Sequence, residues 1–388
     1  MLFRNRTDSV CKQVLIYSDA FLPNIGGAEN YCVDLARTLT DLGEDVTVIT
    51  PIQSHTEDTF NFSLMRMRFP IFIGFNVNFL EPFFHIVRKN PKVVILSGPA
   101  ISDFALIPLL SLLRIPIMVV FHGQFNKKWG RAIMKLIAPV LYRLSGKIIV
   151  ETNRDLKYLK DMNIPASKTA SFIFNGVDTE KFKCAPGGER FSKPEDHGSL
   201  RSIFIGGLTS SRPYKGINLV LDIFKRIGSS EIDPTPELVI VGGGDLLESL
   251  SNSTRNFKNI HFLGFLNDDE LIRELCRSDL LILPSSTNGE GLGKVVFEAV
   301  SCGKPVMVSK FAGASEIVGK YEAGVIFDPY DTVGAIDVIK FLNSHRELLE
   351  KFSLNGQRMM TEEGLDLLNT TKKHIRVYEE TRASIKKH

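Results

Sequence analysis

Two glutamates, Glu290 and Glu298, flank a glycine-rich segment with the composition of a ligand-binding loop. On one continuous helix they would be rotated by roughly 80° and separated by about 12 Å, so they would share no face. Gly291 and Gly293 instead place Glu290 in a loop and predict a helix that starts near Lys294. The start of a helix offers backbone N–H groups to an anion. We expect the two carboxylates to reach opposite ends of a ligand whose phosphates lie between them, although a loop followed by an ordinary helix also explains the spacing.

A second candidate segment, Ser211–Gly216, lies between a predicted strand and a predicted helix and contains two cations. Arg212 supplies a planar guanidinium and Lys215 a point charge, and a departing diphosphate requires fixed positive charge of this kind. A solvated loop is the alternative interpretation.

Two other candidates follow predicted strands in the first half of the chain. Gly26 and Gly27 let a ligand approach the backbone closely, although a plain tight turn needs them too. His122 follows the apolar run Met118–Phe121, which places it at the carboxyl end of a strand. Open α/β sheets bind ligands at this edge, but a structural histidine is equally compatible with the sequence.

The sequence predicts no metal site. Asp268 and Asp269 follow Asn267 in a segment that is typical of a helix N-cap. The cysteines have no metal-type or redox-type spacing, which predicts free thiols in a reducing cytoplasm; they are Cys11, Cys32, Cys184, Cys276 and Cys302. The first residues lack the apolar core of a signal peptide, so we expect a cytoplasmic protein.

Short apolar runs alternate with amphipathic helical patterns, which predicts an α/β fold of two doubly wound, Rossmann-like domains facing across a cleft. The first strand series is Gln13–Ser18, Asp45–Thr50, Lys92–Ser97, Ile115–Phe121 and Lys147–Glu151. The second series is Ser202–Ile205, Leu238–Val241, His261–Leu263, Leu280–Leu283, Pro305–Val308 and Val325–Phe327. A linker-like stretch, Cys184–Gly198, separates the two series. We predict domains of residues 1–186 and 187–370, with a helix of residues 371–388 packing back on the first.

Charge is distributed unevenly along the chain. Residues 1–193 contain 24 Lys and Arg against 17 Asp and Glu, whereas the remainder contains 23 against 27. The basic excess is strongest in residues 127–160, which also contain the only tryptophan, Trp129. This composition suits a surface that rests on anionic lipid, although the solvated faces of two helices explain most of it. No recognition-helix or RNA-binding signature accompanies the charge, so we expect no nucleic-acid partner.

Several short motifs occur in the order found in one enzyme family, and together the chain resembles the retaining GT-B glycosyltransferases of glycosyltransferase family 4. The resemblance runs from Val14 to about Asp331. The motifs are Gly26–Glu29, Phe121–Gly123, Phe174–Asp178, Lys215–Gly216, Leu238–Gly244, Phe262–Phe265, Leu283–Ser285 and Glu290–Ala299.

The resemblance implies transfer of a hexose-type sugar from a UDP- or GDP-linked donor to an acceptor hydroxyl, with retention of configuration and without a cofactor or metal. It implies that Glu298 holds the ribose and that Glu290 engages the donor sugar. It implies that Leu292, Gly293 and Lys294 are backbone donors to sugar and phosphate. Gly26, Gly27 and the cation Lys215 would lie at the diphosphate. His122 would lie near the reacting sugar, and Phe265 where the base is held.

One position departs from the family pattern. Most members have an arginine directly after the glycine that ends the first strand of the second domain, and here that residue is Gly207. Arg212, in the longer loop that follows, is the candidate replacement.

Other functions stay open on the sequence alone. A nicotinamide-dependent oxidoreductase would need Gly-x-Gly-x-x-Gly in the first strand-to-helix turn, which the chain lacks. A GT-B epimerase, a donor hydrolase and a non-catalytic partner subunit are the alternatives. The basic first half favours a lipid-linked or anionic acceptor, such as a glycan in cell-surface polysaccharide assembly, and hence a position on the cytoplasmic face of the membrane.

Overall fold

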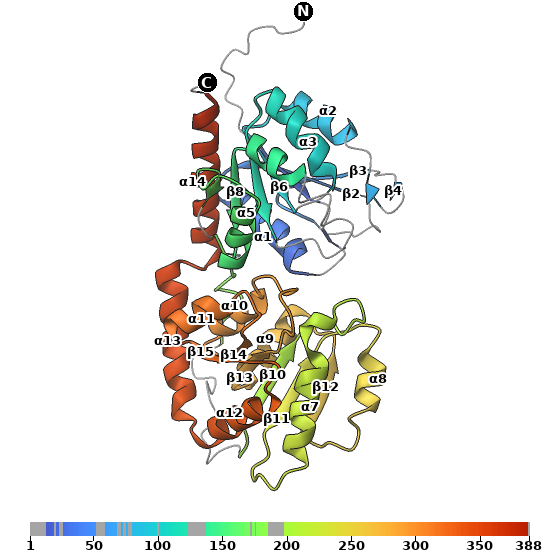
Figure 1. Cartoon of the computed structure of the whole chain (residues 1–388), viewed down its shortest axis with the longest axis vertical. Coiled ribbons are helices and arrows are strands. Elements are labelled where there is room, and N and C mark those ends of the chain that lie inside the picture. Colours follow the sequence, from blue (N-terminus) through green and yellow to red (C-terminus); the bar gives the residue numbers. More distant parts are fainter. Residues whose placement is uncertain are drawn as a thin grey trace, which may run out of the picture. The chain divides into compact units, whose positions relative to one another are not determined.

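The computed structural model of the chain comprises two compact units, each with its own parallel sheet (Figure 1). The first unit contains the residues up to Gly176 together with those from Leu367 onward, and the second runs from Val177 to Asp366. The structure describes residues 13–18, 21–22, 26–51, 59–67, 71–72, 75–76, 80–98, 101–122, 137–170, 173–174, 176–184 and 198–386.

The first unit is built on a seven-stranded sheet of order β3-β2-β1-β6-β7-β8-β9, in which every pairing is parallel. Its strands are β1 (Gln13–Ser18), β2 (Asp45–Pro51), β3 (Ser63–Met67), β6 (Val93–Ser97), β7 (Ile117–Phe121), β8 (Lys147–Val150) and β9 (Thr169–Ala170). A separate antiparallel pair consists of β4 (Ile71–Phe72) and β5 (Phe75–Asn76). The five strands predicted for this half are confirmed, and the edge strands β3 and β9 were not predicted.

Helices cover both faces of this sheet, because alternate residues of the buried strands point in opposite directions. Leu15 and Tyr17 pack into one apolar cluster with residues of α2 and α3, whereas Val14 and Ile16 pack into another with residues of α1 and α14. The helices are α1 (Gly27–Asp41), α2 (Leu80–Lys89), α3 (Ile101–Leu112), α5 (Asn153–Asp161) and α14 (Leu367–Lys386), and residues 137–144 are also helical.

The C-terminal helix α14 is part of the core of the first unit and contacts α1, β7 and β8. Tyr378 is fully buried, and its hydroxyl donates to a carboxylate oxygen of Glu44 at 2.6 Å. The same glutamate pairs with Lys92, and the lysine ammonium lies over the Tyr378 ring. Sequence-distant polar contacts therefore hold this helix on the sheet.

The second unit has a six-stranded parallel sheet of order β12-β11-β10-β13-β14-β15. This is the doubly wound order in which strand order reverses beside the first strand of the unit. The strands are β10 (Arg201–Ile205), β11 (Glu237–Val241), β12 (Ile260–Gly264), β13 (Leu280–Leu283), β14 (Val306–Ser309) and β15 (Gly324–Phe327). All six strands predicted for this half are confirmed, as is the α/β fold class.

Amphipathic helices surround the second sheet. Helix α7 buries Val220, Phe224 and Ile227 against it, in the spacing expected of a helix face. The helices are η1 (Pro213–Lys215, a 3₁₀ turn), α7 (Ile217–Gly228), α8 (Leu247–Asn252), α9 (Asp268–Arg277), α10 (Lys294–Ser301), α11 (Ser315–Tyr321), α12 (Thr332–Ser344) and α13 (Glu347–Glu363). Helix α9 starts with the capping box of Asn267 and Glu270, which confirms the predicted helix cap.

Two sequence-based expectations are wrong in this region. Cys184 and Cys276 form a disulfide, with Cα atoms 5.6 Å apart, instead of two free thiols. The units also divide at Gly176 and not at the predicted residue 186, because the segment that follows packs on the second unit. There Ser301 Oγ donates to the Phe182 carbonyl at 2.7 Å. The disulfide could not be predicted from the sequence, because the two cysteines are 92 residues apart along the chain and only the fold brings them together.

Two other cysteines keep the predicted thiol form. Cys32 and Cys302 are free and buried. Burial raises the pKa of the Cys32 thiol to about 11 and that of Cys302 to about 12. Cys11 lies outside the described residues.

Candidate active site

The loops after β10 and β13 meet at the point where the strand order of the second sheet reverses. Lys215, in the turn η1, donates to both carboxylate oxygens of Glu290 at 3.0 Å. Both side chains are largely buried, with 16% and 9% of their surfaces exposed. The Ser285 hydroxyl lies 3.5 Å from the same carboxylate. The structure thus joins two predicted site residues from different loops in one ion pair.

Backbone packing fixes the position of Lys215. Gly216, the next residue, has φ 72°, and a Cβ there would stand 1.8 Å from the Pro284 carbonyl oxygen. Only glycine fits so close an approach at a left-handed backbone. The Ser286 N–H donates to the Tyr214 carbonyl at 2.8 Å, which ties the two loops a second time. The lysine is therefore held by its backbone as well as by the ion pair.

The predicted helix start after Gly293 is confirmed, because α10 runs from Lys294 to Ser301. Gly293 is the N-cap, with φ 80°, and the structure shows no side chain capping the helix there. Such an end presents main-chain N–H groups and the positive end of the helix dipole. Leu292, directly before the cap, is buried.

Glu298 lies in the second turn of α10 and pairs with Lys294, one turn earlier, at 3.8 Å. Glu290 and Glu298 therefore have different lysines as partners, as expected for two carboxylates that do not share a helix face. Both members of the Lys294 pair are largely buried.

Arg212 lies beside the position where the family pattern has an arginine. A Cβ at Gly207 would stand 3.9 Å from Nη1 of Arg212. The guanidinium from the longer loop thus reaches the space that a side chain at Gly207 would enter. Arg212 is half-buried.

Phe265 follows β12 and is exposed over 68% of its surface, although it is a large aromatic residue. Its Cβ would lie 3.9 Å from a Cβ at Gly243, in the loop after β11. That loop packs directly on the loop after β10, because a Cβ at Gly242 would stand 2.0 Å from the Gly206 carbonyl oxygen. An aromatic face is thus exposed at the same sheet edge as Lys215.

In the first unit, His122 follows β7 and has both ring nitrogens engaged. Its Nδ1 donates to Glu151 at 3.2 Å, and its Nε2 lies 2.9 Å from the Ser97 hydroxyl. The Cys32 thiol in turn donates to Ser97 Oγ at 3.1 Å. With Nδ1 protonated toward the carboxylate, Nε2 of a neutral ring accepts from Ser97. The ring is therefore held between the ends of β6 and β8.

Sequence reasoning missed Glu151 and Ser97. Both stand at the carboxyl ends of strands that neighbour β7, which is the same signal that identified His122. Applying that rule to every strand end would have found them.

Tyr31 extends this group toward the C-terminal helix. Its ring packs edge-on against His122, with centroids 4.8 Å apart, and its hydroxyl lies 2.7 Å from Nε2 of His374. The Nδ1 of His374 is 2.8 Å from the Thr370 carbonyl, so Nδ1 donates and Nε2 accepts from Tyr31. Burial lowers the pKa of His374 to about 4 and raises that of Tyr31.

The glycine turn of the first unit is described from Gly26 onward. Gly26 is the N-cap of α1 in an extended conformation, and Gly27 is exposed with nothing within 4 Å of a Cβ position. Glu29 lies in the first helical turn, where its carboxylate would meet a Cβ at Gly26 at 2.4 Å. Residues 23–25, which complete the motif, lie outside the described residues.

A pocket of about 610 Å³ lies between β3 and α2 in the first unit. Its lining combines two arginines and a histidine with one carboxylate and apolar side chains: Met65, Arg66, Met67, Glu81, Phe84, His85 and Arg88. Partial burial, with Lys89 and Arg88 nearby, lowers the pKa of His85. The positive charge and exposed Phe84 suit a ligand with both anionic and apolar parts.

Of the basic stretch of residues 127–160, the structure describes residues 137–160. Residues 127–136, including Trp129, lie outside the described residues. The helix of residues 137–144 exposes Ile137, Val140 and Leu144, whereas Arg143 donates to the Asn163 carbonyl. No helix among the described residues is long and apolar enough to cross a membrane.

Comparison with known proteins gives two family matches that follow the two units. Residues 25–181 match the family described as Glycosyltransferase Family 4, and residues 189–359 match Glycosyl transferases group 1.

Named relatives are about a quarter identical to the chain over the regions that match. The phosphatidyl-myo-inositol mannosyltransferase of Mycobacterium tuberculosis is 25% identical over 80% of this chain and 81% of its own length. The sulfoquinovosyl transferase SQD2 of Arabidopsis thaliana is 23% identical over 84% of this chain, and the match spans 65% of that longer protein. Among solved structures, Anabaena HepE in complex with UDP matches 94% of this chain and 98% of its own, with a TM-score of 0.75 and 17% identity.

Proposed function

Because the chain belongs to the GT-B glycosyltransferases of group 1 and family 4, we propose that it transfers a hexose-type sugar from a nucleoside diphosphate donor to an acceptor hydroxyl, with retention of configuration. The observation that carries this proposal is the buried ion pair of Lys215 and Glu290 at the switch point of the second sheet. The pair supports the proposal because a cation suited to a diphosphate lies next to a carboxylate suited to sugar hydroxyls.

The donor lies along the loops of the second unit in this proposal. Lys215 and Arg212 bind the diphosphate, and the uncapped start of α10 donates main-chain N–H groups to it. Glu298 accepts from the ribose hydroxyls, and the exposed ring of Phe265 stacks near the base. HepE, a relative in fold, binds UDP, which supports a UDP-linked donor.

Residues of both units have a role in the transfer step. The bond between the anomeric carbon and the diphosphate oxygen breaks while the acceptor oxygen bonds to that carbon on the same face. The acceptor proton passes to the departing diphosphate oxygen, whose charge Lys215 and Arg212 stabilise. His122, with both ring nitrogens engaged by Glu151 and Ser97, positions the sugar without accepting the proton. We propose that Gly26 and Gly27 approach the diphosphate and that no metal or cofactor takes part.

We propose an acceptor that has an anionic group beside an apolar part, such as a lipid-linked glycan or a glycolipid. The basic pocket between β3 and α2 supports this, since Arg66 and Arg88 line it together with Phe84. The named mannosyltransferase relative acts, by its name, on phosphatidyl-myo-inositol. Residues 127–160 would then rest on an anionic membrane, on its cytoplasmic face.

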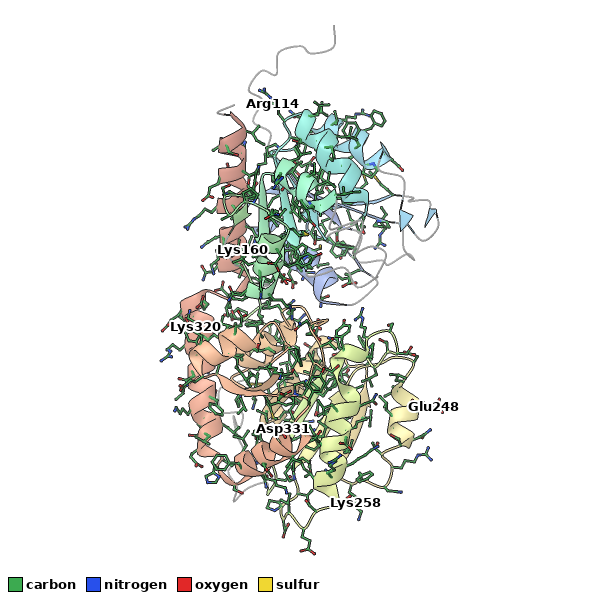
Figure 2. All side chains as sticks on the ribbon, viewed as in Figure 1. Arg114, Lys160, Glu248, Lys258, Lys320 and Asp331 are labelled. Atoms are coloured by element: carbon green, nitrogen blue, oxygen red, sulfur yellow. A yellow bond between two sulfur atoms is a disulfide. The ribbon has the colours of Figure 1, made fainter. Side chains whose placement is uncertain are left out.

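A donor panel tests the proposed function directly. Purified protein is first tested by thermal shift with UDP, GDP and ADP, because a bound nucleotide stabilises the fold by mass action. Nucleotide release and product anomer are then measured with UDP- and GDP-hexoses and a lipid extract as acceptor. Lys215→Ala is expected to lower turnover by about two orders of magnitude. Lys258→Ala, an exposed lysine of the same unit, is the matched control and keeps wild-type turnover (Figure 2).

Each outcome of this panel has a defined meaning. Transfer with retention supports the proposal. Release of free sugar without transfer identifies a donor hydrolase, and an altered donor sugar identifies an epimerase. A chain that binds none of the three nucleotides would be a non-catalytic subunit, and the proposal would be wrong.

A further inference from the structure

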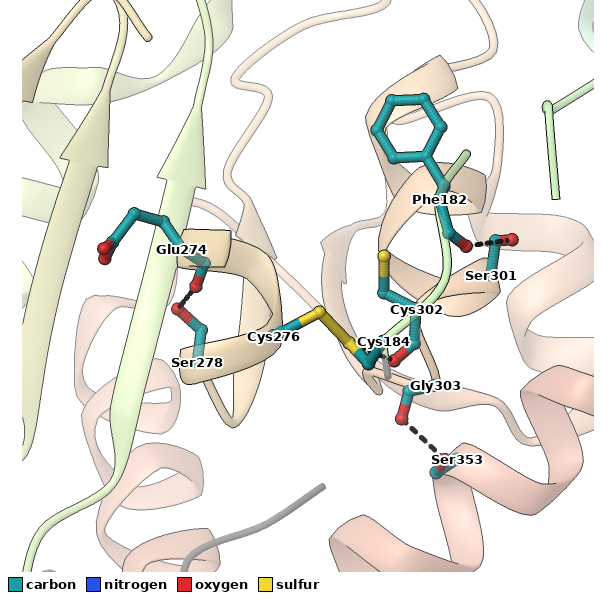
Figure 3. Close-up of a disulfide and its surroundings, with 9 residues drawn as sticks. All are labelled: Phe182, Cys184, Glu274, Cys276, Ser278, Ser301, Cys302, Gly303 and Ser353. Carbon is teal, nitrogen blue, oxygen red and sulfur yellow. Dashed lines mark hydrogen bonds between the residues drawn. A yellow bond between two sulfur atoms is a disulfide. The ribbon is translucent and has the colours of Figure 1, made fainter. Parts of the chain in front are cut away.

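Three cysteine sulfurs converge in the second unit, away from the loops that bind the donor. Cys184 follows the first residues of the unit, Cys276 lies in α9, and Cys302 caps the C-terminal end of α10 (Figure 3). The sulfurs of all three lie within 4.8 Å of one another, and two of them form the disulfide. Among the described residues, no histidine, carboxylate or further cysteine joins this group.

Hydrogen bonds, besides the disulfide, hold the backbone beside each cysteine, and beside Cys276 the Ser278 Oγ donates to the Glu274 carbonyl at 2.8 Å (Figure 3). Ser301 Oγ donates to the Phe182 carbonyl at 2.7 Å, beside Cys184 and Cys302. Ser353 Oγ, from α13, donates to the Gly303 carbonyl at 2.6 Å. Opening of the disulfide therefore leaves the three backbones in place, and the sulfurs stay close together.

We propose that, when the disulfide is reduced, Cys184, Cys276 and Cys302 form a three-thiolate site for a thiophilic divalent cation of the zinc class. Zinc binds cysteine sulfur at about 2.3 Å, and tetrahedral geometry then spaces the sulfurs by about 3.8 Å. The sulfurs of Cys184 and Cys276 move apart to that spacing once the disulfide is reduced, and the Cys302 sulfur is already within reach. Soft thiolates favour such a cation over magnesium or calcium.

The fourth coordination position is open to water. Cys184 and Cys276 are half-buried, so solvent reaches one side of the cluster, whereas Cys302 closes the other side from the interior. Three protein ligands and one water complete a tetrahedral sphere. The site lies at the opposite end of α10 from Gly293, so the proposed cation takes no part in the transfer step.

The disulfide and the cation-bound state exclude each other. Reduction adds two electrons and two protons to the sulfurs of Cys184 and Cys276, and a dithiol or phosphine reductant supplies the electrons. Binding of the cation then releases the thiol protons of the three cysteines. In either state the cluster ties the segment before Cys184 to α9, by a covalent bond in one case and by coordination in the other.

Cobalt titration of the full chain tests this site. The protein is reduced with a phosphine, which competes weakly for metal, and titrated with Co²⁺ under argon. We expect one equivalent to bind with thiolate-to-cobalt absorption, and Zn²⁺ to displace it. The oxidised protein is expected to bind none.

Two variants assign the ligands. Cys302→Ser, which leaves the disulfide intact, is expected to lower the affinity of the reduced protein for Co²⁺ at least tenfold. Cys32→Ser, at the buried thiol of the first unit, is the matched control and keeps wild-type affinity. Circular dichroism shows that both variants are folded before titration. Absence of thiolate-to-cobalt absorption in the reduced wild type, or wild-type affinity in Cys302→Ser, would overturn the proposal.

Discussion

The ion pair of Lys215 and Glu290 gives a quantitative test of the site that needs no substrate. Replacing Lys215 by methionine keeps an unbranched apolar chain that is one atom shorter, and it leaves the Glu290 carboxylate without its bidentate partner. Breaking a fully buried pair costs about 3–5 kcal/mol. The side chains here are 16% and 9% exposed, so we take about 3 kcal/mol for Lys215→Met. For Glu290→Gln, which leaves the more exposed lysine, we take about 2 kcal/mol.

The double variant carries neither charge and therefore leaves no ion unpaired. We expect the double variant to lose about 2 kcal/mol of unfolding free energy, whereas additive effects would give about 5 kcal/mol. The difference, about 3 kcal/mol, is the coupling energy of the pair. An exposed ion pair would couple by about 1 kcal/mol or less.

Urea unfolding of the four proteins, followed by circular dichroism at neutral pH, measures this coupling. Equal m-values across the set would show that the change is in stability and not in the denatured state. A coupling below about 0.5 kcal/mol would refute the buried pair and, with it, the prepositioned lysine.

Three further predictions follow from other parts of the structure. Glu298→Gln should weaken UDP binding by about tenfold, because one charged hydrogen bond is lost, with little change in turnover at saturating donor. Glu290→Gln should do the reverse. Calorimetry measures the affinities and initial rates measure the turnover, and equal losses of affinity would contradict the division of roles. Gly216→Ala should destabilise the protein by about 2 kcal/mol or more, because its Cβ would meet the Pro284 carbonyl. Gly291→Ala, which has open space at its Cβ, is the control and should change stability by about 0.5 kcal/mol at most. Thermal unfolding compares the two variants. Burial lowers the pKa of His374 from the ordinary 6.5 to about 4, so its contribution to stability is present above pH 6.5 and is lost as the pH falls toward 4, by about 3 kcal/mol in all. His374→Gln should therefore flatten the difference in urea stability between pH 7 and pH 4.5, and an unchanged slope would refute the assignment.

The sequence predicted the sheets well because their strands are buried on both faces and are therefore continuous apolar runs. Strands β1 and β13 have the predicted ends, and helix α10 starts at the predicted Lys294 because Gly293 cannot continue a helix in its left-handed conformation. Edge strand β3 escaped prediction because its sequence, Ser63–Met67, contains an arginine and faces partly outward.

Contacts between distant segments were not predictable in the same way. Glu151 and Ser97 contact His122 only because β6, β7 and β8 are neighbours in the sheet. The apolar periodicity of each strand does not predict the order of the strands. Cys184 and Cys276 were wrongly predicted to be free thiols for the same reason, since spacing along the chain says nothing about a contact that folding creates.

Lys215 resolves an electrostatic conflict that the proposed donor site would otherwise contain. A carboxylate and a phosphate oxygen about 4 Å apart repel by about 4 kcal/mol at the effective dielectric of a protein surface, so Glu290 alone would oppose donor binding. The Lys215 ammonium, which already donates to both oxygens of Glu290, offsets this repulsion. Its positive charge also attracts the diphosphate. In the proposed site the carboxylate then accepts from hydroxyls of the donor sugar, whereas the ribose hydroxyls lie at Glu298. The positions of Glu290 and Lys215 are thus mutually dependent, and replacement of either one should change the effect of replacing the other.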